Sequence, residues 1–127
     1  MSEQRERRHS PRTLLPWRIA ARVRDLREVR LLDLSVGGAR LEHLGLLRPG
    51  ARCDVELPPM LGGLLLTADV AWCTVLRRRR GLDGERHLLS HTGLRFAPLT
   101  PTQQATFADA LQRVTARQMR ESRLGSA

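Results

Sequence analysis

The segment LLLTADVAWCTVL, residues 64–76, shows the longest strand pattern in the chain. From Leu64 onward every second residue is apolar except Thr74, and a period of two is typical of a strand with one face on a core. On this pattern Trp72 shares its face with Val70 and is predicted to lie inside the fold. The residues expected to point inward are Leu64, Leu66, Ala68, Val70, Trp72 and Leu76.

Shorter strand patterns lie on both sides of this segment. Before it, Cys53, Val55 and Leu57 alternate with charged residues until Pro58 and Pro59 end the strand. After it, residues 77–85 contain two glycines and predict a hairpin tip. The strands expected on alternation are residues 17–24, 29–34, 39–42, 53–57, 64–76 and 87–96.

The periodicity changes to that of a helix after residue 99. Thr100, Pro101 and Gln103 form a helix start, with a threonine cap, a first-turn proline and a capping-box glutamine. Behind them, Phe107 and Val114 belong to an apolar stripe at helical spacing. Short strands at close intervals followed by one helix indicate a small antiparallel β-barrel whose opening or sheet edge the helix covers. We expect one domain with an arm at 1–13, a barrel at 14–99, a helix at 100–123 and a tail at 124–127.

Charge is the most unusual feature of the composition. The chain has 127 residues, a net charge of +9 and a pI near 11.6, and all 22 of its Lys and Arg residues are arginine. Such a balance favours anionic partners. No apolar run approaches the roughly 20 residues that cross a bilayer, and the polar N-terminus is unlike a secretory signal. We therefore expect a cytoplasmic protein without a membrane span, whose Cys53 and Cys73 stay reduced.

The sequence contains no recognisable catalytic or metal-binding motif. It has no G-x-S-x-G elbow, no P-loop and no H-E-x-x-H, and its four histidines are scattered. His87 and His91 would lie roughly 13 Å apart along an extended strand, too far apart to share one metal ion. We therefore expect no enzyme, no metal and no cofactor.

Two short motifs carry the chemistry instead. Arg8 and Arg12 form an R-x-x-x-R preceded by Arg7, and Pro11 argues against a helix there. In an extended arm an even separation directs both guanidiniums to one side, and each planar fork can bind a phosphate or a guanine edge. In a chain so rich in arginine this motif would be weak evidence alone.

The second motif ends a predicted strand. Asp33, Ser35 and Gly38 form a D-x-S-x-x-G, in which the carboxylate and the hydroxyl alternate with Leu34 and share a face. A carboxylate can accept hydrogen bonds from guanine N1 and N2, and a hydroxyl can donate and accept. Gly37 and Gly38 allow a positive φ and a close backbone approach to a ligand. An ordinary turn between two strands is the alternative explanation.

Taken together, the two motifs resemble the signature of the PilZ domain family, with 20 residues between Arg12 and Asp33. The resemblance extends over about residues 6–120, because Gly93 to Phe96 also looks like the closing strand of the family. It implies a six-stranded antiparallel barrel with a C-terminal helix. It also implies binding of cyclic di-GMP, a bacterial second messenger.

The resemblance assigns roles to residues of this chain. It implies that Arg8 and Arg12 hold the phosphates and guanines, that Asp33 and Ser35 read a guanine edge, and that Gly38 makes room for the ligand. An arginine at the position of Arg7 often accompanies a stacked pair of ligand molecules in the family, which favours two per domain. Some members also place a tryptophan beside the ligand, which makes Trp72 a candidate contact as an alternative to a core position.

The expected mechanism is a binding-induced ordering. Without ligand, the arm at 1–13 carries like charges that repel one another, and an anionic ligand would neutralise and order it. The new surface would then act on a downstream partner protein. The alternatives are an adaptor that works without ligand, a basic nucleic-acid-binding barrel and, remotely, a zinc or hydrolytic enzyme. With two Trp, two Phe and no Tyr, the chain has few platforms for base stacking, which counts against specific nucleic-acid binding.

Overall fold

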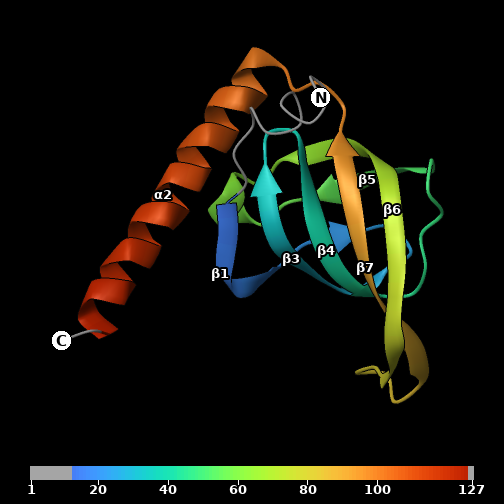
Figure 1. Ribbon diagram of the computed structural model, residues 1–127. Helices are drawn as coiled ribbons and strands as arrows, with labels where there is room; N and C mark the ends of the chain where they lie inside the picture. The colour runs from blue at the N-terminus through green and yellow to red at the C-terminus, as the bar shows by residue number, and fades with distance from the viewer. Residues whose placement is uncertain (1–12, 126–127) are drawn as a thin grey trace, which may run out of the picture.

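The computed structural model describes the backbone of residues 13–125 and, within it, the side chains of residues 19–117 and 120. The described chain forms seven strands, a 3-10 turn and one long helix (Figure 1). In order they are β1 (Thr13–Ala20), β2 (Arg22–Val23), β3 (Arg27–Ser35), β4 (Gly38–Leu44), β5 (Arg52–Glu56), η1 (Pro59–Leu61), β6 (Leu65–Arg80), β7 (Arg86–Phe96) and α2 (Pro101–Gly125).

The strands form a nearly closed antiparallel barrel. Their order is β1-β3-β4-β7-β6-β5-β2, so the two edge strands are consecutive in the chain and separated by Ala21 alone. β1 pairs with β3, whereas β2 pairs with β5. The single strand expected over residues 17–24 is therefore two strands, which raises the count from six to seven. The predicted fold class, a small antiparallel barrel with a C-terminal helix, is confirmed.

The core is apolar, with a small polar cluster at one point. His43 and Thr92 are fully buried and share a hydrogen bond of 2.6 Å between Nε2 and Oγ1. Burial lowers the pKa of His43, assisted by the nearby charge of His91 and opposed by a hydrogen bond to the Leu44 carbonyl. The largest fully buried apolar side chains are Phe107, Leu31, Leu34, Leu41, Leu44, Leu57, Leu61 and Val55.

The C-terminal helix begins as the sequence predicts. The Thr100 N–H donates to Gln103 Oε1 at 2.9 Å, and the Gln103 N–H donates to Thr100 Oγ1 at 3.1 Å, a reciprocal capping box. α2 packs against β1 and η1, and Phe107 meets Phe96 edge to face with ring centroids 6.3 Å apart. The helix continues to Gly125, two residues beyond the expected end.

β6 departs from its predicted alternation. Leu66, Ala68 and Val70 are buried as expected, but Trp72 is 40% exposed and Leu76 is 45% exposed. The register with β7 shifts between residues 70 and 72 and again between 75 and 77. Each β-bulge adds one residue to a single strand and reverses the faces of the residues that follow. The prediction that Trp72 and Leu76 point inward is therefore wrong.

The end of β6 and the start of β7 form a hairpin that extends beyond the barrel (Figure 1). The four arginines at 77–80 belong to the strand, so the turn is shorter than the expected tip at 77–85. Both cysteines are free and half-buried, and burial, followed by the charges of Asp54 and Asp69, raises the pKa of the Cys53 thiol. In the part of the chain that the structure describes, no helix has the length and apolar character needed to cross a membrane.

Candidate functional site

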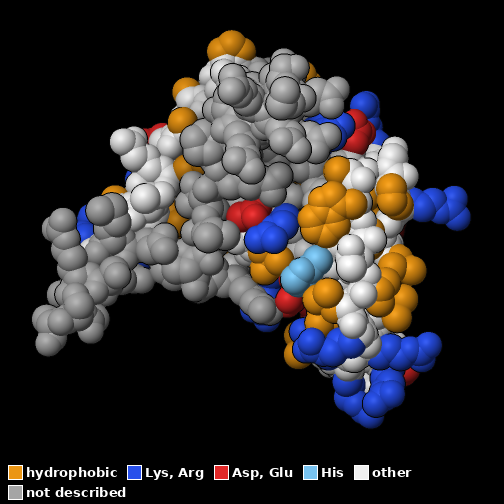
Figure 2. Space-filling view, viewed as in Figure 1, with side chains coloured by type: hydrophobic (Ala, Val, Ile, Leu, Met, Phe, Trp, Pro, Cys, Tyr) orange, Lys and Arg blue, Asp and Glu red, His pale blue; other side chains and the backbone are white. Residues whose placement is uncertain are grey.

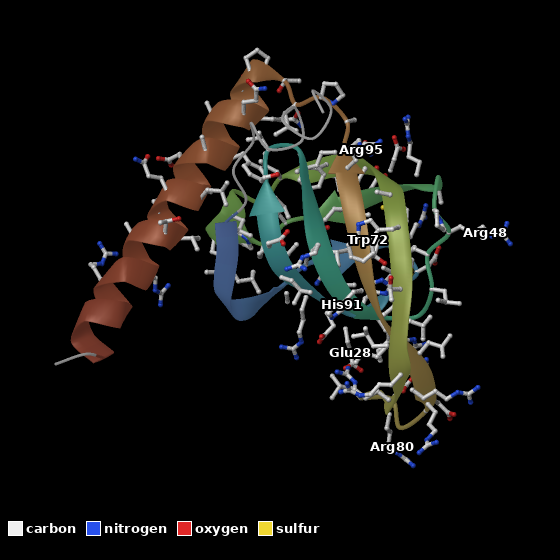
Figure 3. The ribbon with its side chains drawn as sticks, viewed as in Figure 1. Glu28, Arg48, Trp72, Arg80, His91 and Arg95 are labelled. Carbon is white, nitrogen blue, oxygen red and sulfur yellow. The ribbon has the colours of Figure 1, made fainter. Side chains whose placement is uncertain are left out.

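The outer face of β3, β4, β7 and β6 holds the described motif residues in cross-strand rows. One row contains Asp33, Arg40, Gly93 and Trp72, each paired with the next across neighbouring strands. With strands about 4.8 Å apart, a row of four extends about 14 Å. Figure 3 shows that Trp72, His91 and Arg95 lie on this same side of the sheet.

A second row lies two residues away from the first along β3, β4 and β7. It contains Ser35, Gly38, Arg95 and Asp69. Two positions separated by two residues on a strand share a face, so this row and the first form one continuous patch on the outer face of the sheet. We call the two rows together the outer patch. Figure 2 shows acidic, basic, histidine and apolar side chains close together on this side of the molecule.

Asp33 is a buried carboxylate bonded to Arg40 on β4. Its side chain is 4% exposed, and Oδ2 accepts a hydrogen bond from Arg40 Nε at 2.6 Å. Oδ1 accepts a second bond from the Arg40 backbone N–H at 3.2 Å. Charge-assisted bonds of this kind offset the cost of removing a carboxylate from water. The pair fixes the direction of the carboxylate while the Arg40 side chain stays 39% exposed.

Arg40 was not among the residues singled out from the sequence. Its signal lies in the alternation of β4, because the buried residues Ala39 and Leu41 occupy the inner face and leave residue 40 on the outer one. The register then places it directly opposite Asp33. That pairing depends on a bulge between Leu31 and Asp33, which strand alternation alone does not reveal.

Ser35 closes the turn between β3 and β4. Its Oγ accepts hydrogen bonds from the N–H groups of Gly37 and Gly38, both at 3.2 Å, and lies 3.4 Å from the Gly38 carbonyl oxygen. The ordinary serine turn considered from the sequence is therefore present. Together, Asp33 and Ser35 lie on one face as predicted and are both buried.

The two glycines of the motif do not use the left-handed backbone conformation that glycine allows. Neither Gly37 nor Gly38 has a positive φ. A Cβ on Gly38 would lie 2.1 Å from the Leu94 carbonyl oxygen of β7. Glycine is required at position 38 because β4 approaches β7 closely there. The Leu94 backbone oxygen belongs to the sheet and cannot move aside.

Trp72 lies flat against the neighbouring strand. A Cβ on Gly93 would be 2.2 Å from its Nε1 and 2.5 Å from its Cε2, so the indole covers the bare Cα of β7. The ring is 40% exposed on the outer patch. The sequence left open a core position and a position beside the ligand for Trp72. The side chain points outward, where an aromatic face is available for stacking.

A third row adjoins the outer patch. His91 Nε2 lies 3.1 Å from Glu42 Oε2, and the Glu42 side chain is 7% exposed. Among the described residues, no group of three or more His, Cys, Asp and Glu side chains could hold a metal ion. A separate groove of about 670 Å³ lies at β2 and β5, lined by Glu28, Asp54 and Glu56 among others, and contains none of the motif residues.

The remaining site predictions fall on Arg7, Arg8 and Arg12, which lie outside the described residues. The structure describes β1 from the residue directly after the motif. Thr13 pairs with Leu34 and the next residue pairs with Asp33. The residue that follows the R-x-x-x-R motif is therefore paired to the centre of the D-x-S-x-x-G strand.

Comparisons with known proteins agree with this fold. The PilZ domain family matches residues 6–113. Among solved structures, the chain is similar to the PilZ domain with c-di-GMP of YcgR from Escherichia coli, with a TM-score of 0.63 and 19% sequence identity. The similarity covers 91% of this chain and 96% of that one. No curated protein matches.

Proposed function

The chain belongs to the PilZ domain family, and from that membership we propose that it is a receptor for cyclic di-GMP that relays the signal to a partner protein. The observation that carries the proposal is the β1–β3 register. Thr13, the residue after the R-x-x-x-R motif, pairs with Leu34 in the sheet, so a ligand on the outer patch would lie close to the point where the motif joins β1. The similar structure from Escherichia coli is a PilZ domain with c-di-GMP, which supports the same ligand.

The chemistry of cyclic di-GMP suits the groups on the outer patch. Its two phosphates match the guanidinium forks of Arg8 and Arg12, and a guanine edge offers N1 and N2 hydrogens to the oriented Asp33 carboxylate. The exposed face of Trp72 can stack on a purine, an interaction worth about 1–3 kcal/mol per base. Arg7 adds a third cation, which favours two stacked ligand molecules over one.

Ligand binding would join residues 1–12 to the barrel. That segment contains four arginines and two glutamates, and phosphates would neutralise its excess positive charge. The partner would then recognise a surface made of the arm and the outer patch together. This coupling makes the domain a switch with no catalytic step.

A calorimetric titration with cyclic di-GMP at moderate salt tests the proposal. GTP and GMP serve as ligand controls, and saturable heat with cyclic di-GMP alone is the expected result. Arg8→Ala should weaken binding at least tenfold, because one charge-assisted hydrogen bond contributes about 1.5–3 kcal/mol. Arg24→Ala is the matched control, since Arg24 is exposed, has no described ion pair and lies outside both motifs. Equal affinities of the two variants would refute the site.

One observation favours the ligand-independent adaptor as a second candidate. Without ligand, Asp33 is already bonded to Arg40 and Ser35 to its own turn, so both motif side chains also have a structural use. An adaptor would keep them for folding alone. Absence of heat, together with an unchanged melting temperature at high ligand concentration, would favour this candidate over the receptor.

A further inference from the structure

The β6–β7 hairpin carries a concentrated positive charge away from the outer patch. Residues 77–86 contain five arginines and two acidic residues, a net charge of +3. The hairpin extends past the end of the barrel in Figure 1, and Figure 2 shows basic side chains gathered at this end of the molecule. Arg80, labelled in Figure 3, lies at its extremity.

Three arginines without a described acidic partner share one face of the hairpin, and one of them, Arg80, donates to the Gly84 carbonyl at 3.2 Å. Arg80 pairs directly with Arg86 across the ladder, and Arg78 lies two residues before Arg80 on the same face. None of the three has an acidic partner among the described residues, in contrast to Arg79, which bonds Glu28 at 2.5 Å. Like charges directly opposite each other destabilise a sheet. The face is thus arranged for an anion that comes from outside the protein.

The turn between the strands presents an apolar side chain at its apex. Leu82 is 91% exposed, the most exposed large hydrophobic residue of the described chain. Four backbone N–H groups of the turn, those of Gly81, Leu82, Gly84 and Glu85, already donate within the protein. These bonds run from Gly81 to the Glu85 carbonyl at 2.8 Å, from Leu82 to Glu28 Oε2 at 2.7 Å, from Gly84 to the Gly81 carbonyl at 3.0 Å and from Glu85 to Asp83 Oδ1 at 2.9 Å.

The barrel holds this turn in a fixed position. Glu28 has a φ of 51° and a side chain only 16% exposed, and it bonds both the Arg79 guanidinium and the Leu82 N–H. Beside it, Arg27 pairs with Asp83 at 2.8 Å. A turn held from two sides keeps Leu82 outward, so little conformational entropy remains to be lost when it docks.

We propose that this hairpin docks the protein on an anionic lipid surface, with Leu82 in the headgroup region and Arg78, Arg80 and Arg86 on the lipid phosphates. An apolar apex flanked by arginines suits an interface that is apolar below and anionic above. Because the Leu82 N–H and three of its neighbours already donate within the protein, those groups lose no hydrogen bonds to water when the turn enters such a layer. The same bonding leaves those N–H groups unavailable as a phosphate nest, which counts against a nucleic-acid backbone as the partner.

Vesicle sedimentation without cyclic di-GMP tests this proposal independently of the receptor function. The full chain is mixed with vesicles of phosphatidylcholine alone or of equal parts phosphatidylcholine and phosphatidylglycerol. We expect binding to the anionic vesicles only. Arg78→Gln with Arg80→Gln should lower the partition coefficient about thirtyfold, since one arginine near an anionic surface contributes roughly fivefold. Arg24→Gln with Arg48→Gln removes the same charge from exposed positions elsewhere and should change it by much less.

A second pair of variants tests the contribution of the Leu82 side chain to vesicle binding. Leu82→Ser should weaken binding to anionic vesicles by about tenfold, whereas Leu46→Ser, at a position 57% exposed outside the hairpin, should not. Thermal unfolding confirms that each variant is folded. Equal losses for the hairpin and control variants would overturn the proposal. So would hairpin-dependent binding to duplex DNA without binding to the vesicles.

Discussion

Gly93→Ala tests the position of Trp72, because the three nearest atoms to the added Cβ all belong to that side chain. The added Cβ would lie 2.2 Å from Trp72 Nε1, 2.5 Å from Cε2 and 2.9 Å from Cδ1. Gly93 has no positive φ, so alanine suits its backbone. The indole is 40% exposed and can rotate away into solvent. We therefore expect the strand to keep its place and Trp72 to leave it.

The size of the effect follows from the surface that the ring would expose. An aromatic side chain buries 150–250 Å², at about 25 cal/mol per Å². Exposing a further third or so of the indole therefore costs about 2 kcal/mol. Replacing a strand glycine by alanine returns about 0.5–1 kcal/mol. The net loss in the free energy of unfolding is then about 1–1.5 kcal/mol, and ligand affinity should fall roughly five- to 150-fold if one stacked base is lost.

Urea denaturation followed by circular dichroism gives the first quantity, and calorimetric titration with cyclic di-GMP gives the second. The matched control is the same substitution in a Trp72→Ala background. There the clash is absent, so Gly93→Ala should be neutral or stabilising by up to about 1 kcal/mol. If Gly93→Ala destabilises both backgrounds equally, Trp72 is not the group that the glycine accommodates, and the reasoning fails.

Three other predictions concern stability. Gly38→Ala places a Cβ 2.1 Å from the Leu94 carbonyl oxygen, a backbone atom that cannot move, so urea denaturation should show a loss of about 3 kcal/mol or more. His43 has a pKa lowered chiefly by burial; stability should be constant above about pH 6.5 and fall below it by at most about 1.4 kcal/mol per pH unit, because the unfolded chain takes up a proton first. A flat profile between neutral pH and pH 5 would contradict this. Thr100→Ala removes the acceptor for the Gln103 N–H and should lower the free energy of unfolding by about 1 kcal/mol, measured by thermal melting.

Local patterns in the sequence determined most of the secondary structure and the common face of Asp33 and Ser35. Alternation predicts a strand wherever one face is buried, and the capping box at Thr100 and Gln103 predicts the helix start, because both depend on neighbours within a few residues. The common face of Asp33 and Ser35 could be predicted for the same reason. They are two residues apart on one strand, so their common face follows from the strand period alone.

The tertiary structure alone decided which residues meet. The bulge that turns Trp72 outward and the break at Ala21 that lets β1 and β2 pair with opposite edges are properties of pairing between distant strands. The placement of Arg40 against Asp33 likewise depends on the register of β3 with β4. A one-residue change of register reverses a face without changing the hydrophobic content of the strand. For that reason alternation could predict that residue 72 lies in a strand, but only the paired ladder determined that its indole faces outward.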